Sequence, residues 1–182
     1  MHSIMWQPTE EQINNSQMMD YMQLVNQKFG LSLKKYSQLY DWSIEKAEDF
    51  WGSFWEYSQI IHHSPYSQVV DDLGKMPGAK WFDGATLNFA ENLLRYRDDK
   101  IAILFQGEDG TQSSLTYKEL HDQVSRLARS MREMGIVKND RVAGFMPNIP
   151  ETIITMLATA SIGAIWSSCS PDFGIKGVLD RF

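Results

Sequence analysis

Hydrophobic residues recur every three or four positions in several stretches of the chain, which is the spacing of an amphipathic helix. Residues 17–29 follow this spacing and are followed by Gly30, which predicts a helix that ends at the glycine. A longer helix is predicted over residues 44–60, with Ser43 as its N-cap. Its aromatic stripe is interpreted as packing surface, because such stripes form a cofactor site or a partner groove in only a few proteins. The stripe consists of Ala47, Phe50, Trp51, Phe54, Trp55 and Ser58.

Two capping boxes mark further helix starts. Asn88 with Glu91 predicts a short helix that continues through Tyr96. Thr116 with Glu119 predicts a helix that ends before Gly135, with a regular hydrophobic stripe along it.

From residue 101 onward, short hydrophobic runs alternate with helical patterns. Residues 101–106 predict a strand that turns into a short paired strand at residues 113–115. The remaining elements are a buried strand at 141–146, a helix from Pro150 to about Ser161, a strand at 164–168 and the start of a helix at 176–182. This alternation predicts an α/β fold in which crossover helices join the strands of a parallel sheet.

Aromatic residues are unevenly distributed, since residues 1–100 hold 16 of the 22. This contrast predicts two regions, with a boundary near Asp98-Asp99-Lys100. Residues 1–97 form an aromatic-rich helical extension in this interpretation. Residues 98–182 form the first, incomplete part of a parallel-sheet domain, and the unfinished pattern at 178–182 is interpreted as belonging to a longer chain.

Composition excludes several classes of protein. With 43% hydrophobic residues among 182, the chain can bury a core, and its single cysteine cannot form an internal disulfide. The net charge of −6 argues against a nucleic acid or an anionic membrane as partner. Residues 1–6 do not have the pattern of a signal peptide, and the uncharged residues 152–171 are interpreted as a buried helix and strand rather than a membrane span. A cytoplasmic location is therefore expected.

Most catalytic signatures are missing from the sequence. It has neither of the common glycine-rich phosphate loops and no nucleophile elbow around a serine. His62 and His63 are adjacent and point apart in regular structure, so surface or packing roles are favoured over zinc binding together with His121 and Cys169. Cys169 itself is interpreted as a small core residue. No residue is assigned as a catalyst or as a metal ligand.

The segment from Trp166 to Gly174 is the strongest candidate for a ligand site. Its small hydroxyl residues follow the carboxyl end of a predicted parallel strand, where open α/β sheets bind ligands. The alternative is a capped strand-to-helix turn, with Asp172 as N-cap and Gly174 providing tight geometry. The residues alone leave both interpretations open.

The order and spacing of several motifs resemble the opening of the AMP-forming acyl-CoA synthetases. These motifs lie at residues 115–120, 127–128, 135–136, 140–143, 147–151 and 161–168. Residues 82–94, with 170–174 and 178–182, narrow the resemblance to the acetoacetyl-CoA synthetase (acetoacetate–CoA ligase) branch. The aromatic region up to about residue 95 looks like the amino-terminal extension of the acetyl- and acetoacetyl-CoA synthetases.

Two departures from the family pattern are visible. Asn139 stands where the wider family usually has glycine, and a turn that tolerates left-handed geometry accepts this change. Pro171-Asp172 replaces the Gly-Gly pair of acetyl-CoA synthetases, which argues against acetate as substrate. An acetyl- or propionyl-CoA synthetase, or a non-enzymatic protein-binding module, remains an alternative.

The resemblance implies a two-step ligation of an acid to CoA. Acetoacetate, ATP and Mg²⁺ would give an acyl-adenylate and pyrophosphate, and CoA would then release AMP and form acetoacetyl-CoA, a reaction of lipid and fatty acid metabolism. The family's catalytic and nucleotide-binding motifs do not occur within these 182 residues, so the chain alone is expected to be inactive and to bind no cofactor. A sheet that stops at its third or fourth strand has an unpaired edge and uncovered apolar helix faces, so self-association or marginal stability is also expected. Trp166, Asp172 and Phe173 are expected to line the acyl and pantetheine channel.

Overall fold

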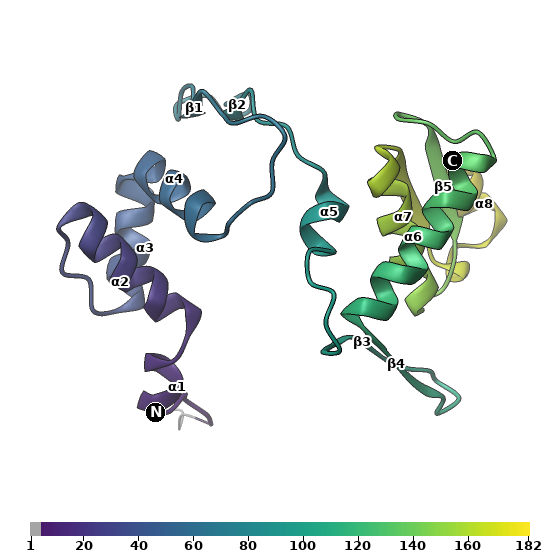
Figure 1. Cartoon of the computed structure of the whole chain (residues 1–182), viewed down its shortest axis with the longest axis horizontal. Coiled ribbons are helices and arrows are strands. Elements are labelled where there is room, and N and C mark those ends of the chain that lie inside the picture. The colour runs from purple at the N-terminus through teal and green to yellow at the C-terminus, as the bar shows by residue number, and fades with distance from the viewer. Residues whose placement is uncertain (1–4) are drawn as a thin grey trace. The chain divides into compact units, whose positions relative to one another are not determined.

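The computed structural model describes residues 5–182 (Figure 1). Residues up to Thr86 form one compact unit and residues from Leu87 onward form a second. The prediction that residues 1–6 are not a signal peptide concerns residues 1–4 as well, and these four lie outside the described residues. Within residues 5–182, no helix has both the length and the apolar composition needed to span a membrane.

The first unit is built mainly from four helices, coloured purple to blue in Figure 1. They are α1 (Glu10–Asn14), α2 (Gln17–Phe29), α3 (Tyr36–Glu45) and α4 (Ala47–Tyr57). The predicted helix over residues 17–29 is confirmed with both of its ends. Gly30 follows α2 with a φ of 66°, the left-handed conformation that glycine adopts without steric cost.

The predicted helix over residues 44–60 is wrong at its start. Ser43 lies inside α3, where its hydroxyl donates to the carbonyl of Tyr40, instead of capping a helix. The helical path breaks at Lys46, whose φ of −124° and ψ of 51° are not helical, and α4 begins at the next residue. The upstream helix forms because Leu39 and Trp42 on α3 are buried in the core of this unit. Tertiary packing therefore outweighs the local capping signal.

A buried hydroxyl of Tyr21 connects α2 to α4. It donates to the carbonyl of Phe50 at 3.0 Å and lies 2.8 Å from the Oγ of Ser53. Burial raises the pKa of Tyr21, and the hydrogen bond with Ser53 opposes that shift. Ser53 is the buried residue of α4, whereas the hydrophobic pattern predicts that the aromatic residues of the stripe are the buried ones.

The aromatic stripe of α4 packs against a small antiparallel hairpin that was not expected from the sequence. The hairpin pairs β1 (Gln68–Val70) with β2 (Trp81–Asp83). The ring centroids of Trp55 and Phe82 are 4.6 Å apart, and those of Trp51 and Trp81 are 6.0 Å apart. These contacts agree with the interpretation of the stripe as packing surface, because each aromatic pair stabilises the interface of helix and hairpin.

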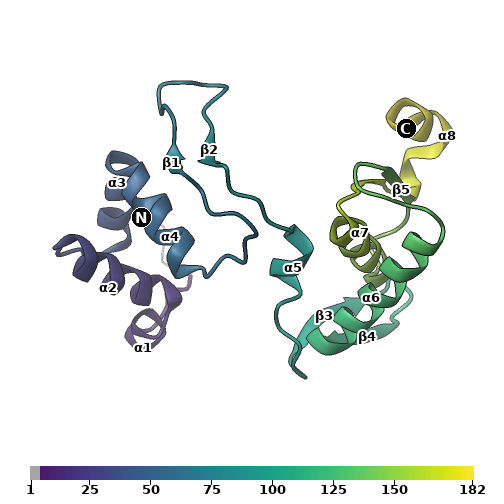
Figure 2. The same cartoon turned by 45° about the horizontal axis from the view of Figure 1, so that its top comes forward.

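The second unit combines four helices with two separate pairs of strands, shown in teal to yellow in Figure 2. Its elements are α5 (Phe89–Leu93), β3 (Ile101–Gln106), β4 (Gln112–Thr116), α6 (Tyr117–Glu133), β5 (Arg141–Phe145), α7 (Pro150–Ile162), β6 (Ile165–Cys169), the 3₁₀ turn η1 (Pro171–Phe173) and α8 (Gly174–Arg181). The start of α5 after Asn88 is confirmed, but the helix ends at Leu93 instead of continuing through Tyr96.

The core of this unit lies between α5, α6 and α7. The stripe predicted on α6 is buried and contacts the apolar side of α7, and the two helices lie side by side in Figures 1 and 2. Burial of this apolar surface is the main source of the unit's stability. The buried residues are Ala90, Leu94, Leu120, Val124, Ala128, Met131, Ile154, Leu157 and Ala158.

The predicted parallel crossover is confirmed for one pair of strands. β5 and β6 are parallel and α7 joins them, with Gly144 opposite Ser168 in the register. β3 and β4 form an antiparallel hairpin of their own, so within residues 5–182 the strands do not join into one sheet. Asn139, before β5, has a φ of 73°, which confirms the left-handed turn expected at this departure from the family pattern.

The prediction that residues 141–146 form a buried strand is wrong for most of β5. Only Gly144 is buried there, and Arg141, Ala143 and Phe145 are exposed. The strand has one neighbouring strand, and successive side chains point to opposite faces, so half of them lack a covering layer among the described residues. The hydrophobic run at residues 141–146 predicts a strand that is buried on both of its faces, but the second unit covers only one face of β5.

Replacing Glu119 with Gln should remove a pH dependence from the stability of α6. The Glu119 carboxylate accepts the Thr116 N–H at 2.8 Å and its hydroxyl at 2.9 Å, and these two bonds lower the pKa of Glu119 below 4.5. A carboxyl group with a lowered folded pKa stabilises the fold above its unfolded pKa and loses that contribution as pH falls through the folded value. Urea unfolding should show the wild type losing its advantage over E119Q as pH falls below about 4.5. An advantage that stays constant to lower pH would contradict this expectation.

Candidate functional site

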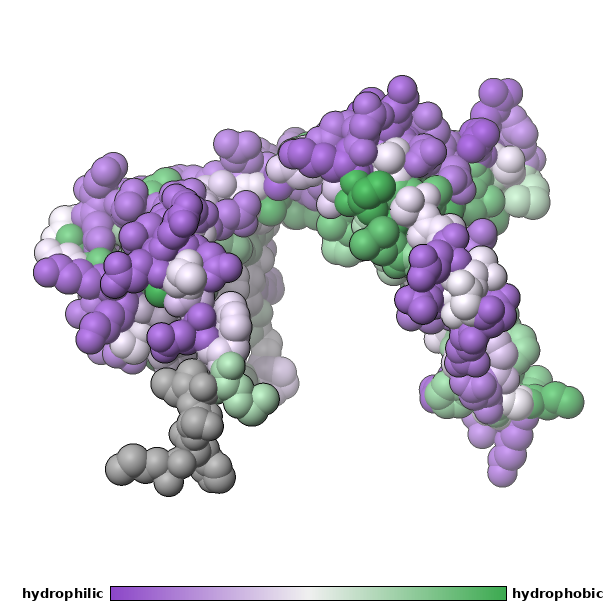
Figure 3. Space-filling view, turned by 90° about the horizontal axis from the view of Figure 1, so that it is seen from below, coloured by the Kyte–Doolittle hydropathy of each residue, from purple (hydrophilic) through white to green (hydrophobic). Residues whose placement is uncertain are grey.

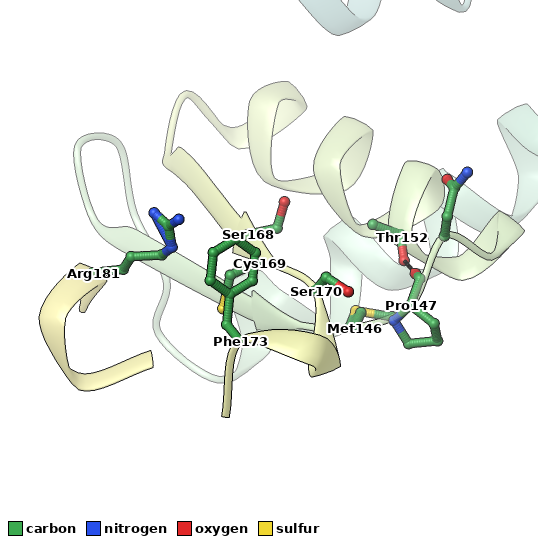
Figure 4. A pocket seen from close by; sticks show the side chains of 9 residues that line it. Met146, Pro147, Thr152, Ser168, Cys169, Ser170, Phe173 and Arg181 are labelled. Carbon is green, nitrogen blue, oxygen red and sulfur yellow. Dashed lines mark hydrogen bonds between the residues drawn. The ribbon is translucent and has the colours of Figure 1, made fainter. Parts of the chain in front are cut away.

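A pocket lies at the carboxyl ends of the two parallel strands. It follows β5 and β6, precedes α7, and is bordered by η1 and α8 (Figure 4). Its volume is about 480 Å³, within the range typical of small-molecule sites. The lining residues are Met146, Pro147, Asn148, Thr152, Ser168, Cys169, Ser170, Phe173 and Arg181.

Backbone and side-chain hydrogen bonds fix the walls formed by the strand ends. The N–H of Met146 donates to the carbonyl of Cys169 at 3.3 Å, which extends the pairing of β5 and β6 by one step. The Thr152 hydroxyl donates to the carbonyl of Pro147 at 2.7 Å and holds the loop before α7, as the dashed line in Figure 4 shows. Hydroxyl, sulfur and aromatic groups therefore face one space, a mixture suited to a ligand with both polar and apolar parts.

Asp172 does not have the capping role considered for it. Ser170 is the N-cap of η1, and its hydroxyl donates to the Asp172 carboxylate at 2.8 Å and accepts the Asp172 N–H at 3.4 Å. Serine caps a helix start because its hydroxyl can reach the free N–H groups of the first turn. The expected tight geometry at Gly174 is confirmed by its φ of 62° and ψ of 177°, a conformation open almost only to glycine.

The three residues singled out from the sequence occupy different places. Phe173 lines the pocket and is 46% exposed. Asp172 is exposed and turned toward Ser170. Trp166 lies on β6 two residues before Ser168, and its ring packs across Gly144, where a Cβ atom would come within 2.4 Å of it. The pocket therefore includes one of the three.

Arg181 is a pocket residue that sequence reasoning missed. Its guanidinium lies 4.0 Å from the centroid of the Phe173 ring, and Figure 4 shows the two side chains beside each other. The residues are eight positions apart, so no short motif connects them. The available signal was the amphipathic pattern of residues 174–181, which places Gly177 and Arg181 on one face of a helix.

Cys169 is 7% exposed, which agrees with its interpretation as a small core residue. The ring of His62 lies against Trp55, and His121 lies beside Asp122. Among residues 5–182, no three His, Cys, Asp or Glu side chains gather into a group that could hold a metal ion.

Two further hollows are less suited to a ligand. One, of about 580 Å³, lies on the β3–β4 hairpin, and no titratable side chain lines it. Another, of about 340 Å³, is lined only by residues of α6 and α7 and by none that follows a strand. The pocket at the carboxyl ends of β5 and β6 is therefore the candidate site, because it alone of the three has the position expected in a parallel sheet.

Relatives of the chain carry closely related names. It is 47% identical over 178 residues to an acetoacetyl-coenzyme A synthetase of Rhizobium meliloti (strain 1021) and 44% identical over 182 residues to an acetoacetyl-CoA synthetase of Macaca fascicularis. Each match covers 98% of this chain and 27% of the relative. A malonamoyl-CoA synthetase (vrtB) of Penicillium aethiopicum is 42% identical, over 92% of this chain and 24% of the relative.

A solved structure of an acetoacetyl-CoA synthetase also has the same fold over the length of this chain. Acetoacetyl-CoA synthetase from Streptomyces lividans matches with a TM-score of 0.88 and 39% identity, over 97% of this chain and 28% of that one. The chain thus spans little more than a quarter of the length of the relatives that it matches.

Two family models match consecutive parts of the chain. The model for the acetyl-coenzyme A synthetase N-terminus matches residues 36–93, and the model for AMP-binding enzymes matches residues 89–180. The second match covers half of the chain and includes every residue that lines the pocket except Arg181. The chain therefore belongs to the AMP-binding enzyme family.

Proposed function

We propose that the chain is the amino-terminal part of an ATP-dependent acid–CoA ligase that acts on acetoacetate. The whole enzyme converts acetoacetate, ATP and CoA to acetoacetyl-CoA, AMP and pyrophosphate through an acyl-adenylate. The observation that carries this proposal is the similarity to acetoacetyl-CoA synthetases of a bacterium and a primate across 98% of the chain.

The names of the relatives also support a class of acid. The acetoacetyl and malonamoyl groups both have a second carbonyl β to the acyl carbon, and they differ by a methyl group in place of an amide nitrogen. Two relatives of similar identity thus act on acids of one shape. We infer that the substrate is a short acid with a carbonyl group at this position, which distinguishes it from acetate and propionate.

The pocket at the strand ends is proposed to form part of the channel for the acid or the pantetheine arm of CoA. Phe173 is its proposed lining residue. The assignment of Trp166 and Asp172 to the same channel stays a prediction, which Trp166→Leu and Asp172→Asn would test. No residue of this chain is proposed as a ligand of Mg²⁺ or as a catalyst.

Several further assignments remain predictions. They are the division into an extension at residues 1–97 and the start of the AMP-binding domain at 98–182, a cytoplasmic location, a role in lipid and fatty acid metabolism, and self-association of the chain. Self-association is supported by large apolar side chains that are mostly exposed, such as Leu104, Ile175 and Leu179. The face shown in Figure 3 is mostly hydrophilic, with patches of hydrophobic residues.

Pyrophosphate release tests the proposed function. The 182-residue chain and a protein extended to the length of its relatives should be assayed with ATP, Mg²⁺, CoA and one of four acids: acetoacetate, malonamate, acetate or propionate. The extended protein is expected to prefer acetoacetate, and the 182-residue chain should release no pyrophosphate with any acid. Preference for acetate or propionate would favour the alternative synthetase, and turnover with none of the four would overturn the ligase proposal.

A further inference from the structure

Two residues of α8 hold the Phe173 ring from one side of the pocket. Gly177 and Arg181 are four positions apart on this helix, so they share a face, and both lie against Phe173. The turn at Gly174 makes this possible, because its positive φ lets α8 fold back toward η1 directly after Phe173.

Gly177 permits a close approach of the helix backbone to Phe173. A Cβ atom at Gly177 would lie 3.0 Å from the Cβ and 3.3 Å from the Cδ1 of Phe173. The Cβ of Phe173 is not the far end of a flexible side chain, so an added methyl group would push the residue itself away. Glycine inside a helix is unfavourable, so its presence here has a structural reason in the contact with Phe173.

Arg181 completes the contact one turn later. Its guanidinium lies over the ring at 4.0 Å, within the range in which a cation is attracted to an aromatic face. Arg181 and Phe173 both line the pocket, so their contact is part of its wall. Lys176 is a second cation on α8 and does not line the pocket. Its replacement therefore changes the charge of the helix without removing a contact to the Phe173 ring.

We propose that Gly177 and Arg181 are positioning residues that fix the Phe173 ring as a wall of the pocket. In this arrangement α8 sets the width of the space that receives the acid or the thiol arm of CoA. The proposal rests on the proposed ligase function for the identity of the ligand, and on the geometry alone for the positioning of the ring.

Access to Cys169 tests the positioning without any assay of activity. Cys169 lines the same pocket and is almost buried, so its alkylation by iodoacetamide, measured by mass spectrometry of the peptide that contains it, reports on the closure of the pocket. Arg181→Ala should raise the alkylation rate about two- to fivefold, the factor that corresponds to one exposed cation–π contact. Gly177→Ala should also raise the rate, because the added Cβ atom would displace Phe173. Arg181→Lys should largely restore the wild-type rate, and Lys176→Ala should leave it unchanged.

Circular dichroism of each variant separates this effect from unfolding, which would accelerate alkylation by any route. Folded R181A and G177A proteins that react at the wild-type rate would overturn the proposal. So would a rate in K176A that rises as much as in R181A, because charge on the helix and not contact with the ring would then be responsible.

Kinetics of the extended protein test the consequence for the ligand. R181A should raise the KM for acetoacetate or for CoA about two- to fivefold, and G177A should raise it in the same direction, while kcat and the KM for ATP stay close to wild type. An equal loss with all three substrates would indicate general damage and would contradict a role in setting pocket width. If the wild-type extended protein has no ligase activity, the proposed function fails, and the alkylation experiment still decides the positioning of Phe173.

Discussion

Replacing Leu157 with Ala is expected to lower the free energy of unfolding by about 2 to 5 kcal/mol. Leu157 is 2% exposed and lies in the core between α5, α6 and α7. Its truncation removes apolar contacts and leaves a cavity that the surrounding core residues fill only in part. Urea denaturation followed by circular dichroism measures the loss.

Leu179→Ala is the matched control for this substitution. Leu179 also lies in a helix, so the change of helix propensity is the same, but its side chain is 74% exposed. We expect a change of no more than about 0.5 kcal/mol. Equal effects of the two substitutions would show that the α5–α6–α7 core does not stabilise the chain as the structure implies.

Gly144→Ala is expected to destabilise the β5–β6 pair by about 1 to 3 kcal/mol. A Cβ atom at this position would lie 2.4 Å from the Cη2 and 2.8 Å from the Cζ2 of Trp166. Neither distance is tolerated, so the indole must move off the strand and lose its packing. The indole N–H resonance of Trp166 should shift in the ¹⁵N–¹H spectrum, and the unfolding midpoint in urea should fall.

Two further variants separate the clash from other effects at this site. Ala143→Ser adds one heavy atom at the neighbouring exposed position of β5, and it should change stability by no more than about 0.5 kcal/mol. In a Trp166→Leu background the cost of Gly144→Ala should fall by at least about half, because residues in contact are not additive. Full additivity of the two substitutions would contradict a direct contact between them.

Capping and turn motifs in the sequence predicted the helix ends correctly where the interactions involved lie within a few residues. The capping box of Thr116 and Glu119 and the left-handed stop at Gly30 each set a helix end by short-range hydrogen bonds and backbone sterics, and both occur where the sequence predicts them. The parallel pairing of β5 and β6 also follows from the sequence, because parallel strands need a long crossover connection and the predicted helix between the two strands provides one.

Signals failed where distant packing competes with them. Ser43 is an acceptable N-cap, but Leu39 and Trp42 are buried against other helices, and the helix around Ser43 forms because of that burial. The hydrophobic run of β5 resembles a strand buried on both faces, although only one face is covered among the described residues. In both cases the decisive contacts are with elements that a local window does not contain.

The sequence by itself determined the order of the helices and strands in the second unit, the position of the turn at Gly174 and the family resemblance of the segment around it. Only the tertiary structure decided which side chains meet at that turn. It placed Phe173 in the pocket, turned Asp172 toward Ser170 and set Trp166 over Gly144. It also brought Arg181 back onto Phe173 from eight residues away. The physical reason is that spacing along a chain defines which face of an element a residue occupies, whereas contacts between elements depend on how those faces pack.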